Sequence, residues 1–192
     1  MRARSIGVFF WGFAIGALSV TLLVSRSSPL PPVSVAAKTA AAVVDSRPRI
    51  GLPIAGLQAK DIQDTFSQLR GGSRPHEATD VLAPRGTPVL AVDAGTIKKL
   101  FTSKPGGLTV YQFDPQVVYC YYYAHLDRYA TNLKEGMTVN RGDLIGYVGT
   151  TGNAPANTPH LHFAIFKLGV LKRWWEGTPI NPYPFLIEAL KQ

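Results

Sequence analysis

Cysteine is almost absent from this chain of 192 residues, which has a single one, Cys120. A single thiol excludes an intrachain disulfide, so cysteine usage says nothing about the compartment, and we expect Cys120 to be buried. Long helical periodicity and internal repeats are also lacking, which leaves short strands as the main element. Because 46% of the residues are hydrophobic and 10% are aromatic, the chain has enough apolar side chains for a real core.

Tracts of lysine or arginine are absent as well, although the formal charge is +8. Residues 1–50 contain six basic residues and one acidic residue, a net charge of +5. Residues 51–192 contain fourteen basic and eleven acidic residues, so they carry only +3. This distribution lacks the basic footprint of a nucleic-acid-binding surface, and we expect no nucleic-acid partner.

Residues 6–24 form a long apolar run without a charged side chain, and two arginines precede it. Nineteen residues at the helical rise span about 30 Å, longer than the apolar part of a signal peptide. We therefore predict a transmembrane anchor over 1–24, in the inner (cytoplasmic) membrane, with the rest of the chain on the periplasmic or extracytoplasmic side. The alternative is a signal peptide cleaved near Ala36 or Ala37.

Residues 25–49 are rich in serine, proline and alanine, and we interpret them as a spacer before a globular domain over 50–192. Within 55–70 the pattern allows one or two helical turns. Short runs rich in valine, isoleucine, tyrosine and phenylalanine follow, separated by turn residues. They cover 87–95, 96–101, 108–113, 117–126, 144–149 and 160–166. The predicted fold is mostly β, a compact antiparallel sheet or sandwich with short helices.

The four histidines of the chain all lie in patterns that chemistry can use. In a strand over 160–166, His160 and His162 point to one face, about 7 Å apart, and Leu161 points to the core. An exposed strand with two surface histidines is the alternative. His76 and Asp80 are four residues apart, which suits one helical turn or a loop that curls back; an ordinary polar loop is the alternative.

His125 ends a tyrosine-rich run over 119–125. Strand alternation would place it on the same face as Tyr119, Tyr121 and Tyr123. It could be a buried histidine with satisfied hydrogen bonds or a proton carrier. Two imidazoles and a carboxylate with an open fourth position are the usual composition of a catalytic zinc site, and two further histidines would remain to move protons.

Taken in order, five motifs resemble the M23 metallopeptidases, also called LytM or lysostaphin-type endopeptidases. They are H-E-A-T-D, A-P-R-G-T-P-V-L-A-V-D-A-G-T-I, Y-Y-A-H-L, E-G-M-T-V-N-R-G-D-L-I-G-Y-V-G-T-T-G and P-H-L-H-F-A-I-F. The resemblance covers about 52–186. It implies one zinc ion per chain, held by His76, Asp80 and His162, with His125 and His160 as the two catalytic residues that are not ligands. It also implies peptidoglycan as the substrate, cut at a peptide bond.

The chain departs from the family pattern at Ala78, where the motif often has glycine, and in a short stretch over 102–112. Asp127 and Asn181 are candidate residues for orienting the histidines. Trp174 and Trp175 could stack on sugar, but we expect them to cover one end of the core.

Two other functions are compatible with the sequence. A relative that has lost catalysis would bind the wall or regulate a partner hydrolase, and that regulatory partner would be unknown. Residues 135–149 also resemble the hairpin of biotinyl/lipoyl-type domains, but those domains lack the H-x-x-x-D and H-x-H motifs.

Overall fold

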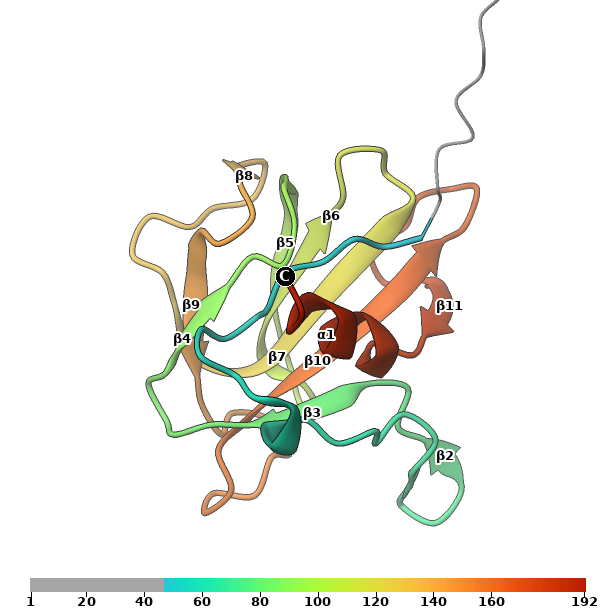
Figure 1. The fold of residues 1–192 in the computed structure, drawn as a ribbon. Coiled ribbons are helices and arrows are strands. Elements are labelled where there is room, and N and C mark those ends of the chain that lie inside the picture. The colour runs from blue at the N-terminus through green and yellow to red at the C-terminus, as the bar shows by residue number, and fades with distance from the viewer. Residues whose placement is uncertain (1–46) are drawn as a thin grey trace, which may run out of the picture. The chain divides into compact units, whose positions relative to one another are not determined.

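The computed structural model describes residues 47–192 (Figure 1). The anchor predicted over 1–24 and most of the spacer predicted over 25–49 lie outside the described residues. Within residues 47–192, no helix is both long enough and apolar enough to cross a membrane.

Strands dominate the described part of the chain. They are β1 (Leu69–Arg70), β2 (Arg74–Pro75), β3 (Thr79–Leu82), β4 (Pro88–Leu90), β5 (Gly95–Ser103), β6 (Gly107–Phe113), β7 (Tyr119–Tyr129), β8 (Thr138–Val139), β9 (Leu144–Val148), β10 (His160–Leu168) and β11 (Gly177–Ile180). The helical elements are a single 3₁₀ turn, η1 (Ala59–Asp61), and a short helix, α1 (Tyr183–Ala189). The prediction of a mostly β domain with short helices is confirmed, and each of the six predicted runs contains a strand.

Nine strands form one antiparallel sheet, whose main path is β11-β10-β7-β6-β5-β8. β10 pairs with β7 along one edge, and its other edge is shared between β3 at its start and β11 at its end. β7 pairs with β6 and then with β9, which also binds β4. The long strands β7 and β10 therefore lie side by side and connect all parts of the sheet (Figure 1).

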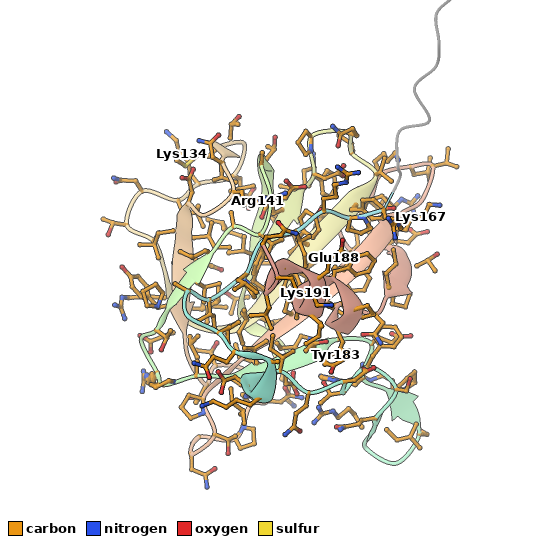
Figure 2. The ribbon with its side chains drawn as sticks, in the orientation of Figure 1. Lys134, Arg141, Lys167, Tyr183, Glu188 and Lys191 are labelled. Carbon is orange, nitrogen blue, oxygen red and sulfur yellow. The ribbon has the colours of Figure 1, made fainter. Side chains whose placement is uncertain are left out.

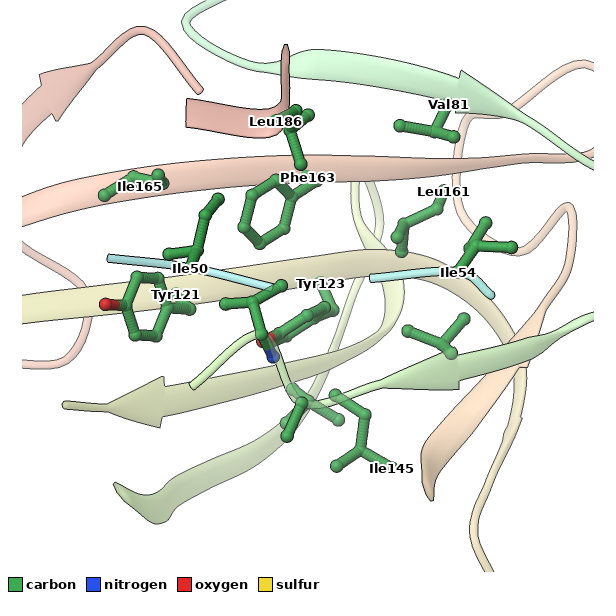
Figure 3. Close-up of a cluster of buried hydrophobic side chains, with 14 of the residues drawn as sticks. Ile50, Ile54, Val81, Tyr121, Tyr123, Ile145, Leu161, Phe163, Ile165 and Leu186 are labelled. Carbon is green, nitrogen blue, oxygen red and sulfur yellow. The ribbon is translucent and has the colours of Figure 1, made fainter. Parts of the chain in front are cut away.

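The main core covers one face of β7 and β10 (Figure 3). Tyr121 and Tyr123 of β7 lie with Leu161 and Phe163 of β10, and all four are at most 1% exposed. Burial of such a side chain contributes roughly 1.5–3 kcal/mol to folding. Leu186 of α1 covers Phe163 from outside the sheet in Figure 3. Alternation along β10 thus places Leu161 in the core, as predicted, and leaves the opposite face to the histidines.

The buried hydroxyl group of Tyr123 in this core has hydrogen-bond partners on both sides. Tyr123 Oη donates to Gln112 Oε1 at 2.8 Å and accepts the N–H of Val92 at 3.0 Å. These bonds offset the cost of burying a hydroxyl group and tie β7 to β6 and to the segment after β4.

A smaller cluster lies apart from the main core and contains Cys120, which is fully buried as predicted. Trp174 is partly buried and packs against this cluster, which agrees with the expected covering role. Trp175 does not share that role, since 61% of it is exposed. On the outer surface, Glu188 of α1 and Lys191, which follows this helix, are solvent-exposed; both are labelled in Figure 2.

Candidate metal centre

The pairing of β3 with β10 brings two of the predicted ligands together, because Asp80 and His162 are direct cross-strand partners. His76 follows β2 and reaches the same place through a turn in which Glu77 has φ of 58°. His76 Nε2 lies 3.0 Å from His162 Nδ1 and 3.1 Å from Asp80 Oδ1. His162 Nδ1 also lies 3.1 Å from Asp80 Oδ1. The three residues therefore offer one ligand atom each to a common point.

The left-handed residue of this turn is Glu77, whereas Ala78 has no positive φ and is fully buried. A methyl group at Ala78, where the family pattern often has glycine, is thus compatible with the backbone. The His76–Asp80 pair lies in a loop that curls back into a strand, one of the two arrangements that the spacing allowed.

Thr65 fixes the orientation of His76. The His76 Nδ1 atom lies 3.1 Å from the backbone oxygen of Thr65, and because a carbonyl only accepts, Nδ1 must carry the hydrogen. The lone pair of the neutral ring is then on Nε2, the atom that faces Asp80 and His162. The Thr65 hydroxyl also accepts the N–H of Asp80 at 3.2 Å and donates to the oxygen of Ala78 at 3.2 Å, so one side chain braces the whole turn.

The donor set fits zinc. Tetrahedral coordination with bonds of about 2.0 Å places the ligand atoms about 3.3 Å apart, close to the separations of 3.0–3.1 Å among His76, Asp80 and His162. Burial alone would raise the pKa of Asp80, but its hydrogen bonds with His162 and His76 hold that pKa well below the usual range. Burial lowers the pKa of His162. A deprotonated carboxylate and neutral imidazoles are the forms that bind a metal.

His125 reaches the site through a bulge, and the prediction for its face was wrong. Leu126 pairs with Leu108 and Tyr123 pairs with Val110, so two residues of β7 oppose one residue of β6. His125 has φ of 60°, and it lines the groove together with Ala124. Strand alternation would have placed His125 with the core tyrosines, but the extra residue turns it to the histidine face.

His125 and His160 are oriented in the same way. The Nδ1 atom of His125 donates to the backbone oxygen of Thr151 at 2.8 Å, and that of His160 donates to the backbone oxygen of Thr158 at 2.8 Å. The two ring centroids are 4.9 Å apart. Nε2 of His160 lies 3.9 Å from Asp80 Oδ1, beside the ligand cluster. In the neutral form of each ring, the lone pair is therefore on Nε2.

The electrostatics of His125 favour its neutral form. Burial lowers its pKa from 6.5 to about 4, and the nearby His162 and His160 act in the same direction. The bond to Thr151 opposes this shift but does not cancel it. His125 is therefore neutral at physiological pH and can accept a proton.

These side chains open into a groove of ≈ 690 Å³. Its lining includes the charged residues Arg70, Arg74 and Glu77. It also includes aromatic rings, among them Tyr111 and Tyr122. The predicted site residues all line this groove, so the structure brings all five together.

Sequence reasoning missed Arg70 as well as Thr65. Arg70 Nη2 donates to Asp80 Oδ2 at 2.7 Å, at the carboxylate oxygen that does not face the other two ligands. The two residues that the sequence suggested for orienting the histidines, Asp127 and Asn181, bind other side chains instead. Asp127 pairs with Arg85 and Arg128, and the Asn181 amide donates to Asp64. No motif marks Arg70, because its hairpin, β1–β2, meets the site only through the fold.

The fold and the site define a β-sheet protein with a His/Asp/His ligand cluster and two further histidines in an open groove. The model of peptidase family M23 matches residues 74–182, more than half of the chain and a range that includes all five site residues. The chain belongs to peptidase family M23, as its motifs predicted, and the alternative of a biotinyl/lipoyl-type domain is not supported.

Relatives with named activities cover much of the domain. The L-Ala–D-Glu endopeptidase of Bacillus subtilis (strain 168) is 35% identical over 121 residues, which are 60% of this chain and 36% of that protein. Lysostaphin of Staphylococcus simulans is 33% identical over 115 residues, 59% of this chain and 22% of that protein. The match thus spans about a third or less of these relatives.

Solved structures share the fold. The catalytic domain of lysostaphin from Staphylococcus simulans has a TM-score of 0.56 at 29% identity and covers 66% of this chain and 91% of that one. Helicobacter pylori Csd3 has a TM-score of 0.55 at 27% identity and covers 71% of this chain and 33% of that one. The antiparallel β domain therefore shares its fold with the matched parts of these proteins.

Proposed function

We propose that this chain is a zinc-dependent endopeptidase that hydrolyses peptide bonds in peptidoglycan. The observation that carries the proposal is the convergence of five side chains from three segments of the chain. Three of them present ligand atoms to one point, and the other two lie beside it, each with its Nδ1 atom bound to a backbone carbonyl. The peptidoglycan DD-endopeptidase ShyC of Vibrio cholerae, at 34% identity, and the L-Ala–D-Glu endopeptidase of Bacillus subtilis support the substrate class.

His76 Nε2, Asp80 Oδ1 and His162 Nδ1 would hold one zinc ion per chain. Bound there, zinc would supply Lewis-acid chemistry, because it lowers the pKa of a water molecule and polarises the scissile carbonyl. Nε2 of His125 and Nε2 of His160 are the two positions at which the protein can take a proton from that water and deliver one to the leaving amine. The backbone bonds to Nδ1 of each ring hold those two nitrogens in place.

The proposed location follows from the N-terminal sequence. An anchor over 1–24 would hold the chain in the inner (cytoplasmic) membrane, with the domain on the periplasmic or extracytoplasmic side, where peptidoglycan lies. A spacer of about 25 residues would reach some 25–30 Å from the membrane on average. Whether a regulatory partner protein is needed is decided by the activity of the purified chain: a chain that cleaves peptidoglycan alone needs no partner.

The test is zinc content measured in parallel with digestion of purified peptidoglycan by the full-length chain in detergent. We expect about one zinc per chain and release of uncrosslinked peptides that stops when a chelator removes the metal. His160→Ala should abolish cleavage and retain zinc, whereas His162→Ala should lose both. Zinc without cleavage would favour a non-catalytic regulator of another wall hydrolase, and equal zinc retention in both variants would show that the roles are misassigned.

A further inference from the structure

Aromatic rings extend from the ligand cluster along the groove and beyond it. We call this row the aromatic arm; it consists of Tyr111, Tyr122, Phe166, Trp174 and Trp175. Tyr122 begins it, with its ring centroid 5.9 Å from that of His162. The centroid distances are 4.7 Å from Tyr122 to Tyr111, 4.8 Å from Tyr111 to Trp174 and 5.2 Å from Trp174 to Trp175.

The sheet register explains this row. Tyr111 of β6 is opposite Tyr122 of β7, and Tyr122 is opposite Ala164 of β10. Ala164 and Phe166 follow His162 on the same face of β10, and all three line the groove. Four residues of strand from His162 to Phe166 extend about 13 Å, so the arm is longer than one amino-acid side chain.

Packing accounts for only part of the arm. Trp174 covers the smaller core cluster, whereas Trp175 is 61% exposed, contacts the arm through Trp174 and has the Arg173 guanidinium 5.9 Å from its ring centroid. An exposed tryptophan gains little from folding, whereas tryptophan and tyrosine are common where a flat, partly polar surface meets a ligand. The last ring of the arm is therefore placed for contact with something outside the protein.

Charge distinguishes the arm from the surroundings of the ligand cluster. Arg70 binds Asp80 and lines the groove together with Arg74 and Glu77. Beside the arm, the Arg173 guanidinium lies 5.9 Å from the Trp175 ring centroid, but it is paired with Glu176 at 3.2 Å. Because this cation is already paired, the arm favours an uncharged group with a flat apolar face. In peptidoglycan the peptides carry carboxylates and small side chains, whereas each pyranose ring has a flat face of C–H groups edged by hydroxyls.

We propose that the aromatic arm binds the glycan strand of peptidoglycan while the attached peptide lies across the histidines. The inference deepens the proposed function and rests on its substrate class. It assigns the sugar to the aromatic side chains of β6, β7, β10 and the β10–β11 loop, and the peptide to the part of the groove at the five site residues.

The test uses glycan strands from which an amidase has removed the peptides, so that binding is measured without cleavage. The full-length chain in detergent should bind these strands, and Trp175→Ala should weaken that binding about tenfold, as expected for the loss of one stacked ring. Val170→Ser is the matched control, because Val170 lies in the same loop, is 94% exposed and is not part of the arm. The control should bind as tightly as the unchanged chain, and both variants should unfold at the same denaturant concentration.

Three results would overturn the inference. The first is that the chain does not bind peptide-free glycan strands. The second is that Val170→Ser and Trp175→Ala weaken glycan binding equally. The third is that the arm binds free stem peptides instead of glycan. Cleavage of peptidoglycan measured on the same preparation keeps the two proposals separate. Glycan binding without cleavage would refute the endopeptidase activity but support the role of the aromatic arm. Cleavage without glycan binding would support the endopeptidase activity and refute the role of the aromatic arm.

Discussion

Two glycines with similar backbones but different surroundings provide a sharp test of how the site is braced. Gly107 has φ of +65°, and a methyl group on it would lie 2.2 Å from Thr151 Oγ1 and 2.4 Å from the Thr151 carbonyl carbon. Gly136 has φ of +81°, and a methyl group there would have no atom within 4 Å. Alanine at either position adopts a left-handed conformation, but only at Gly107 does it also collide with the backbone.

The magnitudes follow from these contacts. The left-handed conformation costs alanine about 1–2 kcal/mol, and the loss of glycine's freedom in the unfolded chain offsets about half of that. Gly136→Ala should therefore destabilise the protein by about 1 kcal/mol. Gly107→Ala must also displace Thr151, whose hydroxyl donates to Leu126 O at 2.7 Å and accepts the N–H of Leu108 at 3.0 Å. Overpacking and two lost hydrogen bonds raise the expected cost to about 3–5 kcal/mol.

Urea unfolding of the two variants measures this difference directly. Gly107→Ala should also reduce cleavage of peptidoglycan beyond its effect on stability, because the Thr151 carbonyl that must move is the one that accepts the Nδ1–H of His125. Equal free energies of unfolding for the two variants would refute the reasoning, since it would mean that the space around Gly107 is not as tight as the structure gives it.

Two further predictions concern the histidines. Thr65→Ala removes the hydroxyl that braces His76 and Asp80 and should weaken zinc binding roughly tenfold in a chelator competition, whereas Thr158→Ala, whose contact to a histidine is made by the backbone, should leave it unchanged. In metal-free protein, the pKa of His125 is about 4 when folded and 6.5 when unfolded. The unfolded state then binds more protons, so up to about 3 kcal/mol of stability, fully present above pH 6.5, should be lost as the pH falls to 4. His125→Asn tolerates the positive φ and should flatten this part of the urea-unfolding profile; a profile unchanged by the substitution would contradict the assignment.

Much of the fold could be predicted because the strands that matter bury one face. Leu161 and Phe163 alternate with His160 and His162, and period-two alternation is a strong signal when one face is apolar. The short strands β3, β8 and β11 were not expected, because two to four residues carry no readable period. β3 was the costly omission, since its pairing with β10 is what sets Asp80 opposite His162.

The groups that orient the site could not be predicted, because they act mostly through the backbone. Thr151 and Thr158 each bind a histidine by a carbonyl oxygen, which every residue has. Arg70 is a charged side chain at the end of β1, directly before two glycines, and nothing in its sequence neighbours distinguishes it from a solvated arginine. Such partners are visible only when segments far apart in sequence are placed in contact.

The bulge at His125 shows why the site itself breaks the pattern that predicts its strand. Tyr123 and Leu126 both face the main core, so regular alternation would leave room for only one residue of β7 on the groove side near this point. The groove needs Ala124, whose small side chain leaves space beside His162, and also an imidazole next to His160. One inserted residue supplies both, at the expense of a histidine held at φ of 60°. A regular strand at this position could either bury its core residues or present the histidine to the groove. The bulge allows both, and the backbone strain therefore lies at His125.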